Sequence, residues 1–570
     1  DVDWMKQILR NFSRNRSANV NVQGGSDKAV YYIGLACYDE NGMYKDTNLA
    51  DYNSNTFYRR YNVTSNLTLN PFRTTEIKLG IQGYLANANY PASSQASIFE
   101  SAYFTPPTYI APLYPDGKLG AFSGGDINPV AQLGAKGYAN QWRSQVYSNL
   151  RITQQIYKGL SVSGMFSFDT YNYTSNRFTK TPNTYHATGR DANGNLLYEQ
   201  PRRGTENLAY SLSAKGNRAI YLEAAVNYRN TFGRHTVSGM MLFNQSDEIN
   251  TKATNVEEAL PYRFRGLAGR FTFAFDDRYF GEFNFGYNGS ENFAPKNRYG
   301  FFPSVGLGWV ISNEPFFRGA TEVIQYLKLR GTWGRVGNSQ ISGRRFAYLA
   351  TVKDTNDTSY QFGKNMDQTY GTTAIDEYAV DVTWEIADKT NIGLDMRLLN
   401  NKFNLQFDAF KESRKGIYLR RTSIPSYFGM INNPYGNIGK VENKGIEMSV
   451  SYANSWRDWS LSVMGNYSFN RNKVLEDDST VAYPWQKTIG NKVDQRFGLI
   501  ALGLFESPEE IAAAPVQVGD TRPGDIRYKD INGDGKIDEY DKVPIGWGSV
   551  PEIVYGFGFS VGWKGLSLSA

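Results

Sequence analysis

The sequence predicts an all-β protein, built as a large transmembrane antiparallel β-barrel. Apolar and polar residues alternate over many short stretches, which is the period of a strand with two different faces. The connections between these stretches are short and long in turn. Aromatic residues make up 15% of the 570 residues and charged residues only 20%, too apolar a composition for a disordered chain. We expect residues 1–16 to lead into the barrel and residues 17–570 to form its strands and loops.

The alternation begins at Val20 and Val22 and continues to the end of the chain. No window approaches the roughly 18 consecutive apolar residues of a membrane-spanning helix, and the mean hydropathy is −0.50. About 18 strands can be counted, a number found among large barrels. The clearest predicted strands are 31–37, 61–69, 77–85, 160–168, 222–228, 237–243, 271–275, 283–287, 392–398, 403–407, 446–450, 461–469 and 554–563.

The connections favour a barrel over a soluble sandwich. In an outer-membrane barrel, short turns face the periplasm and long loops face outside, so the two sizes alternate. A soluble sandwich has no reason to keep this rule. One exception is 312–325, which lies on the short side and is expected to form a helical turn. The short connections are 70–73, 157–159, 232–234, 276–278, 399–402, 455–458 and 563–565, and the long ones are 39–56, 86–141, 174–217, 246–262, 337–385 and 472–494.

The face of each strand follows from the same alternation. We expect the apolar side to contact lipid and the polar side, which includes Lys78 and Asn284, to face a wet lumen. Aromatic residues near strand ends fit the girdles of rings found at the level of the lipid headgroups. The residues expected to face lipid most directly are Leu79, Ile81, Phe283, Phe285 and Leu461.

Several function classes are excluded by residue counts. One cysteine, Cys37, and two histidines, His186 and His235, exclude a disulfide framework, a Cys/His zinc site and Cys–His or Ser–His catalysis. A net charge of +6 without a Lys/Arg-rich run is a weak case for nucleic acid. We therefore expect neither an enzyme nor a nucleic-acid-binding protein.

A series of motifs in fixed order resembles the SusC/RagA family of TonB-linked (TonB-dependent) outer-membrane transporters of Bacteroidetes. Together these motifs cover most of the chain and are specific. They are Asp-Asp-Arg-Tyr-Phe at 276–280, Arg-Tyr-Gly-Phe-Phe-Pro-Ser at 298–304, Gly-Trp-Val-Ile-Ser at 308–312, Leu-Lys-Leu-Arg-Gly-Thr-Trp-Gly at 327–334, Val-Gly-Asn at 336–338, Trp-Glu at 384–385, Asn-Ile-Gly-Leu-Asp at 391–395, Asn-Ile-Gly at 437–439, Glu-Asn-Lys-Gly-Ile-Glu at 442–447 and Pro-Gly-Asp-Ile at 523–526.

The resemblance implies a cell outer-membrane barrel of about 22 strands closed by an N-terminal plug. It further implies a SusD-type surface lipoprotein as a lid, and TonB-driven import of glycan oligosaccharides or peptides. We expect the plug, the TonB box and the last strands to lie outside these residues, since only residues 566–570 follow the final short turn. The alternatives are a passive porin or a siderophore receptor of the same barrel class, and, less favoured, a secreted all-β polysaccharide-binding protein or enzyme.

The longest loop region, 86–141, is rich in aromatic residues between polar groups. Flat apolar rings suit sugar rings or peptides, but they suit a lid protein equally. Both interpretations stay open. The candidate residues for a substrate or partner are Tyr90, Phe99, Tyr103, Phe104, Tyr109 and Tyr114.

Residues 530–541 match an EF-hand calcium loop, with Gly535 at the sharp turn. Position 12 is Asp instead of Glu, which shortens the reach for bidentate binding. Prolines and glycines on both sides exclude the usual flanking helices, so we expect an isolated, extracellular and structural calcium site. The alternative is an exposed acidic turn without metal. The predicted ligands are Asp530, Asn532, Asp534, the carbonyl of Lys536, Asp538 and Asp541.

Overall fold

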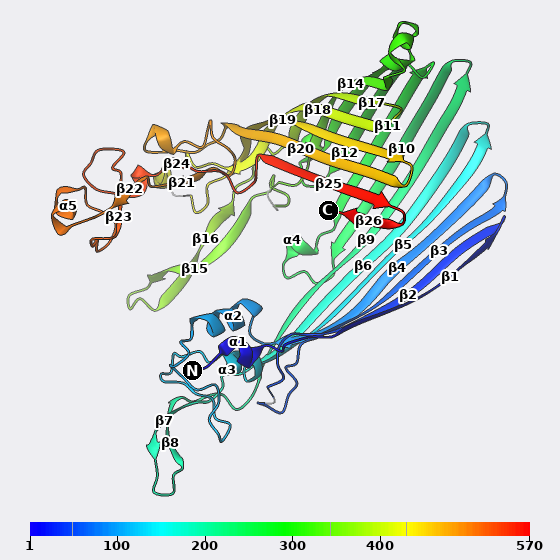
Figure 1. The fold of residues 1–570 in the computed structure, drawn as a ribbon. Helices are drawn as coiled ribbons and strands as arrows, with labels where there is room; N and C mark the ends of the chain where they lie inside the picture. The colour runs from blue at the N-terminus through cyan, green and yellow to red at the C-terminus, as the bar shows by residue number, and fades with distance from the viewer. Residues whose placement is uncertain (48, 342–343, 429) are drawn as a thin grey trace. The chain divides into compact units, whose positions relative to one another are not determined.

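A computed structural model describes residues 1–47, 49–341, 344–428 and 430–570 (Figure 1). The chain divides into two compact units, residues 1–225 with 244–263, and residues 226–243 with 264–570. In this described part, eighteen strands belong to one sheet with antiparallel neighbours. None of its helices is both long enough and apolar enough to cross a membrane. The predicted all-β class is confirmed.

The first unit is built from strands that pair in chain order. The strands from β1 to β6 pair in chain order, each antiparallel to its neighbours, and β7 and β8 form a separate hairpin. Its elements are α1 (Trp4–Ile8), β1 (Asn15–Ser26), β2 (Ala29–Asn41), β3 (Phe57–Phe72), β4 (Thr75–Pro91), α2 (Gln95–Phe104), α3 (Pro129–Gly134), β5 (Gly137–Tyr157), β6 (Leu160–Thr179), β7 (Thr184–Arg190), β8 (Leu196–Arg202), the first part of β9 (Ala209–Phe232), the second part of β10 (His235–Asn250) and α4 (Val256–Ala259).

The register of this unit aligns apolar side chains on one face. Leu67 lies opposite Leu79, Leu79 opposite Leu150, and Leu150 opposite Phe166, so one apolar row crosses β3 to β6. The adjacent row, one residue along each strand, runs through Thr68, Lys78, Arg151 and Met165 on the other face. Because neighbouring residues of a strand point to opposite faces, the two rows separate an apolar surface from a polar one.

The second unit continues the same strand order. Besides the remaining parts of β9 and β10, it contains β11 (Tyr262–Phe275), β12 (Tyr279–Ser290), η1 (Pro295–Asn297), β13 (Tyr299–Val310), η2 (Ile311–Asn313), η3 (Pro315–Ala320), β14 (Ile324–Asn338), β15 (Thr351–Phe362), β16 (Gln368–Glu377), β17 (Glu385–Leu398), β18 (Phe403–Arg420), η4 (Ser426–Phe428), β19 (Tyr435–Trp456), β20 (Trp459–Glu476), η5 (Pro484–Gln486), β21 (Arg496–Gly498), β22 (Ala501–Leu504), α5 (Pro508–Ala513), β23 (Ile526–Tyr528), η6 (Glu539–Asp541), β24 (Val543–Ile545), β25 (Ile553–Trp563) and β26 (Leu566–Ser569).

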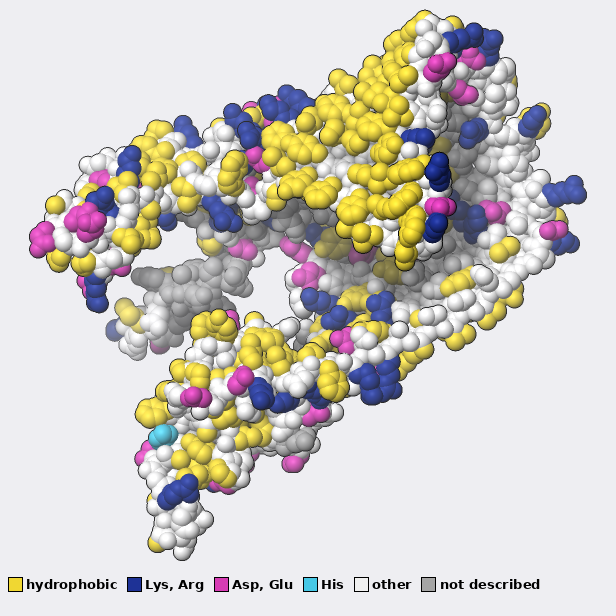
Figure 2. All heavy atoms as spheres, viewed as in Figure 1, with side chains coloured by type: hydrophobic (Ala, Val, Ile, Leu, Met, Phe, Trp, Pro, Cys, Tyr) yellow, Lys and Arg dark blue, Asp and Glu magenta, His cyan; other side chains and the backbone are white. Residues whose placement is uncertain are grey.

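Two contrasting rows also cross the second unit. The apolar row joins Leu329, Leu394, Phe407, Met448 and Tyr467 from β14 to β20. Figure 2 shows hydrophobic side chains gathered over β19, β20 and β25. The polar row beside it passes through Arg330, Gly393, Asp408, Glu447 and Ser468. The expectation of one apolar and one polar sheet face therefore holds in each unit.

The predicted short connections are tight turns. Asp276 and Asp277, between β11 and β12, have φ angles of 54° and 53°. Few residues other than glycine adopt such positive φ angles. Asp and Asn tolerate this left-handed backbone, which suits hairpin turns. The 312–325 connection contains the 3-10 helices η2 and η3, so the expected helical turn is confirmed.

The long loops contain more regular structure than the sequence predicts. β4 continues to Pro91 and β5 begins at Gly137, well inside the expected loop 86–141. Polar contacts hold the end of β4: the side chain of Asn89 donates to the carbonyls of Asn53 and Asn55, at 3.0 and 2.9 Å. The rest of this loop folds into α2 and α3, which pack on α1 through Trp4, Ile8, Ile98, Val130 and Leu133.

Candidate substrate-binding cavity and wall

A cavity of about 1000 Å³ opens among the loops of the first unit. Three segments build it: residues 92–110, which include α2, residues 125–136, which include α3, and residues 177–209, which run from the end of β6 to the start of β9. The small helices position the cavity because their apolar sides form the packed cluster with α1. The charged and aromatic residues that line it are Glu100, Phe104, Tyr109, Asp126, Lys136, Arg177 and Lys180.

The surroundings shift the pKa values of two ionisable groups in this cavity. Burial would raise the pKa of Asp126, but hydrogen bonds from the backbone N–H groups of Ser123 and Phe122, at 2.6 and 2.7 Å, outweigh it and lower the pKa. Tyr109 also donates its hydroxyl to Asp126, at 3.2 Å. Burial lowers the pKa of Lys136, whose side chain is half-buried. The cavity thus contains a carboxylate, Asp126, whose oxygens already accept hydrogen bonds. It also contains a cation, Lys136, that is partly shielded from water.

Only two of the six predicted aromatic residues, Phe104 and Tyr109, line the cavity. Phe99 packs on Tyr44, with ring centroids 6.2 Å apart. Tyr114 packs on Tyr198, and its hydroxyl accepts from the backbone N–H of Ala187 at 3.1 Å.

The other two predicted residues differ in exposure. Tyr103 is exposed beside Phe104, with ring centroids 6.0 Å apart, and Tyr90 lies half-buried in β4. The six predicted residues therefore take different places: two line the cavity, two pack on other rings, one is exposed and one is half-buried. Their role in binding a substrate or partner stays a prediction.

The polar face of β3 to β6 carries residues that the sequence analysis missed. Arg60 on β3 lies over the ring of Tyr84 on β4, 4.0 Å from its centroid. Arg143 on β5 lies over the ring of Tyr173 on β6, at 5.2 Å. Each of these residues lies two positions from another polar residue of the same strand face, and this spacing can be recognised in the sequence. Which strands lie next to each other cannot be recognised there, because it depends on the register.

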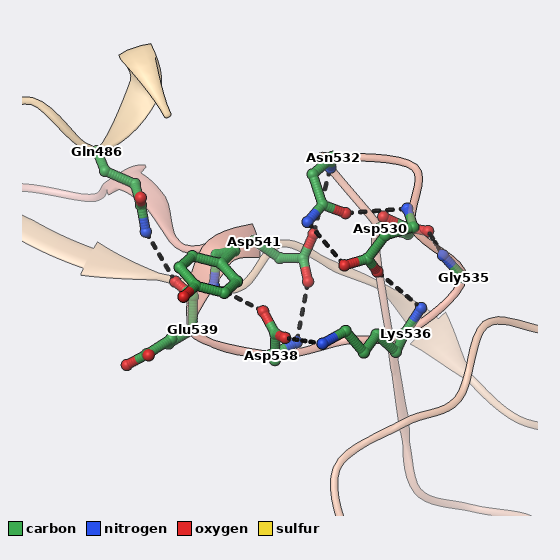
Figure 3. A network of polar contacts seen from close by, with 10 residues as sticks. Gln486, Asp530, Asn532, Gly535, Lys536, Asp538, Glu539 and Asp541 are labelled. Atoms are coloured by element: carbon green, nitrogen blue, oxygen red, sulfur yellow. Dashed lines mark hydrogen bonds and ion pairs between the residues drawn. The ribbon is translucent and has the colours of Figure 1, made fainter. Parts of the chain in front are cut away.

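The acidic loop 530–541 of the second unit is closed by its own carboxylates (Figure 3). Asp530 accepts hydrogen bonds from the backbone N–H groups of Gly533 and Gly535, at 2.7 and 2.9 Å. Asp541, fully buried, accepts from those of Ile531 and Asp538, at 2.8 and 2.9 Å. The loop is also tied to its neighbours, because the indole N–H of Trp485 donates to the carbonyl of Tyr540 at 2.8 Å.

The oxygens of this loop have the chemistry that calcium prefers, but they do not lie close together around one point. Lys536 forms an ion pair with Asp538 at 2.9 Å and lowers the pKa of that carboxyl. Among the residues that the structure describes, no three carboxylate, imidazole or thiol groups gather closely enough to hold a metal ion. Calcium binding would require Asp530, Asp534 and Asp538 to approach one another, and it stays a prediction.

An antiparallel sheet with an exposed apolar face, a polar face, tight turns and structured long loops is the architecture of an outer-membrane β-barrel. The chain belongs to the family described as TonB dependent receptor-like, beta-barrel, which matches residues 5–543. It is thus an outer-membrane protein, as predicted. Its relatives are receptors, in agreement with the expectation that it is not an enzyme.

Individual relatives agree with the SusC/RagA resemblance. TonB-dependent receptor P3 of Formosa agariphila is 24% identical over 616 residues, covering 100% of this chain and 58% of its own. TonB-dependent receptor SusC of Bacteroides thetaiotaomicron is 23% identical over 582 residues, covering 95% and 55%. The structure of the RagAB peptide transporter, at 18% identity, matches with a TM-score of 0.74 over 100% of this chain and 62% of that one. The chain thus spans less than two thirds of each of these relatives.

Proposed function

We propose that this chain forms the barrel of an outer-membrane transporter that imports glycan oligosaccharides or peptides. Family membership supports transport, and the cavity is the observation that carries the proposal. A volume of about 1000 Å³ is at the upper end of ligand pockets, which suits an oligomer better than a single sugar or ion. Its lining combines rings with charged groups, so that ring faces can stack on a substrate while the charges orient it.

TonB, acting through a plug, is proposed as the energy source, and a SusD-type lipoprotein as the lid. The exposed pair Tyr103 and Phe104 supports a protein contact, because the two residues are 81% and 77% exposed at the end of a helix whose Ile98, Ser101 and Ala102 are buried. Aromatic residues are enriched in protein interfaces. A photocrosslinker at Tyr103 in the native membrane should capture the lipoprotein, whereas capture of lipopolysaccharide alone would oppose this assignment.

The cavity is tested in the full-length protein in its native outer membrane. We expect Tyr109→Ala and Lys136→Gln each to reduce uptake of labelled oligosaccharide or peptide pools by roughly tenfold, the equivalent of about 1.4 kcal/mol of lost binding. Tyr157→Ala is the matched control, because this tyrosine is 74% exposed at a short turn. Unchanged uptake in both cavity variants at normal protein levels would reject the cavity as the substrate site.

We also propose that the acidic loop binds calcium as a structural ion. The support is chemical: five side-chain oxygen ligands and one carbonyl occur in the spacing that calcium loops use, with Gly535 at a φ angle of 83° where the turn requires it. In this role the ion would draw together carboxylates that otherwise repel one another. Magnesium is less suited, because it demands tighter octahedral geometry and keeps its waters.

A further inference from the structure

Two arginines occupy one row across three strands of the first unit. Arg60 on β3 lies opposite Ala86 on β4, and Ala86 lies opposite Arg143 on β5. Neighbouring strands are about 4.8 Å apart, so the two arginine backbones are separated by roughly 10 Å with only a methyl group between them. The exposed fraction of Ala86 is 1%. The two arginine side chains are thus held on the same face, two strands apart.

Neither guanidinium is neutralised. Arg60 donates from Nε to the side-chain carbonyl of Asn62 at 2.8 Å, and Arg143 donates to that of Gln141 at 3.1 Å. Their other contacts are the rings of Tyr84 and Tyr173. Among the described residues, no carboxylate forms an ion pair with either arginine. Glu40 lies diagonal to Arg60, opposite Tyr58, and its carboxylate accepts from the hydroxyl of Tyr38 at 2.8 Å.

Other arginines of the polar face are paired with carboxylates. Arg151 lies on the same strand and the same face as Arg143. It forms an ion pair with Glu223 at 3.0 Å. Arg330, in the second unit, contacts both Asp395 and Asp408. Two like charges on one face repel each other, so leaving Arg60 and Arg143 without a counter-charge is unfavourable in the absence of a ligand. A bound anion would remove this repulsion.

The positive charge continues toward the cavity. Arg177 lies on β6 four residues beyond Tyr173, and so on the same face. It lines the cavity together with Lys136 and Lys180, and its guanidinium donates to the carbonyl of Ala92, a neutral partner. The opposing carboxylate Asp126 is already engaged by two N–H groups and by the hydroxyls of Tyr109 and Ser123, while the other lining carboxylate, Glu100, is exposed. Cations therefore run from the cavity to the Arg60–Arg143 row.

We propose that Arg60 and Arg143 bind carboxylate or sulfate groups of an acidic oligosaccharide. This deepens the proposed function and rests on it. Guanidinium groups bind carboxylate and sulfate oxygens through paired, charge-assisted hydrogen bonds, and the hydrogen bonds to Asn62 and Gln141 engage only part of the five N–H donors of each guanidinium. Tyrosine rings and the amides of Asn62 and Gln145, which lie opposite and beside Tyr84, offer sugar rings stacking faces and hydroxyl partners.

The test measures binding to the purified full-length protein. The probes are oligogalacturonate, its fully methyl-esterified neutral form, a sulfated galactan oligomer of equal length, and an oligoglutamate peptide. We expect an acidic saccharide to bind at least tenfold more tightly than the neutral form, and rising salt to weaken only the acidic probe. Preference for the uronate or the sulfated probe identifies the anionic group. Tighter binding of oligoglutamate than of either acidic saccharide would overturn the saccharide assignment.

Variants separate the arginine row from general effects. Arg60→Gln and Arg143→Gln should each weaken the acidic probe about tenfold, and Arg143→Lys less, because lysine keeps the charge but loses the paired geometry. The control is Arg59→Gln, on the opposite face of β3, where Arg59 is paired with Asp39 at 2.9 Å. Unchanged binding in both glutamine variants would overturn the inference. Retained uptake of a neutral oligosaccharide would then leave the proposed transport intact, whereas loss of uptake of every saccharide and peptide by the unaltered protein would reject transport itself.

Discussion

Arg330 on β14 crosses a neighbouring strand to reach Asp408 on β18, with 2.6 Å between its Nη2 and the carboxylate oxygen. The residue between them in the register is Gly393 on β17. A Cβ atom at Gly393 would come within 2.4 Å of the guanidinium carbon of Arg330. The missing side chain therefore leaves the passage through which an ion pair joins alternate strands of the polar face.

This relationship predicts the effect of Gly393→Ala. The added methyl group should displace the Arg330 side chain and separate it from Asp408, which is 13% exposed. The loss of a charged hydrogen bond in this setting should lower the free energy of unfolding by about 1 to 3 kcal/mol, measured as a shift of the urea unfolding midpoint in detergent. Gly331→Ala is the control, because a Cβ atom there meets nothing within 4 Å. An equal shift in both variants would contradict the conclusion that the missing side chain of Gly393 makes room for Arg330.

The lipid-facing assignment predicts unequal tolerance of arginine on the two sheet faces. Arginine at Leu79, within the apolar row, should destabilise the barrel by about 2 to 4 kcal/mol near the bilayer midplane. Replacing the adjacent Lys78 with arginine should have little effect. The same contrast is expected between Phe283 and Asn284, and Ile81, Phe285 and Leu461 should behave as Leu79 does. Refolding into lipid vesicles measures it, and equal tolerance of both faces would contradict the barrel orientation.

Acid should loosen the start of β25 through Glu552. Arg471, with both hydrogen bonds at 2.9 Å, and then Lys492 lower the pKa of this carboxyl from 4.5 to about 2. Because the folded-state pKa is the lower one, its stabilising contribution is complete above the unfolded pKa and is lost as the pH falls from about 4.5 toward 2. Hydrogen exchange of the amides near residue 553 should accelerate in that window. Glu552→Gln should remove this pH dependence, whereas Glu476→Gln, at a carboxylate that is 63% exposed, should preserve it.

The two roles of the acidic loop can be separated by mutation. Asp534→Ala should abolish calcium binding in calorimetry but leave the loop ordered, because Asp530 and Asp541 still hold its backbone. Asp541→Ala should lose both properties, since it leaves buried N–H groups unsatisfied at about 1 to 3 kcal/mol each. Absence of heat on addition of millimolar calcium to the unaltered protein, with the loop unchanged in Asp534→Ala, would leave only the turn interpretation.

The sequence predicts those features that depend on local periodicity. The apolar faces that carry Leu67 and Leu79 follow from period two alone, and Asp276 and Asp277 mark a turn because few other residues accept a left-handed backbone. The ends of strands were harder to predict. β4 extends through Asn89 by side-chain hydrogen bonds to a distant loop, and nothing in its own segment shows those partners.

The candidate site shows the same division. The aromatic loop could be found from composition, but its residues take different roles: Phe104 lines the cavity while Tyr114 packs on Tyr198. Arg60 and Arg143 are separated by more than eighty residues in sequence, and only the register of three strands brings them into one row. Long-range pairing of this kind is not encoded in any short window.

The most direct measurement is uptake of a labelled oligosaccharide or peptide pool by cells that carry the full-length protein, with and without a protonophore. An active transporter of the TonB-dependent class should lose most uptake when the membrane is de-energised, and a strain lacking the gene should match the de-energised cells. Uptake that continues unchanged without the membrane potential, yet still requires the gene, would contradict energy-driven import and identify a passive channel.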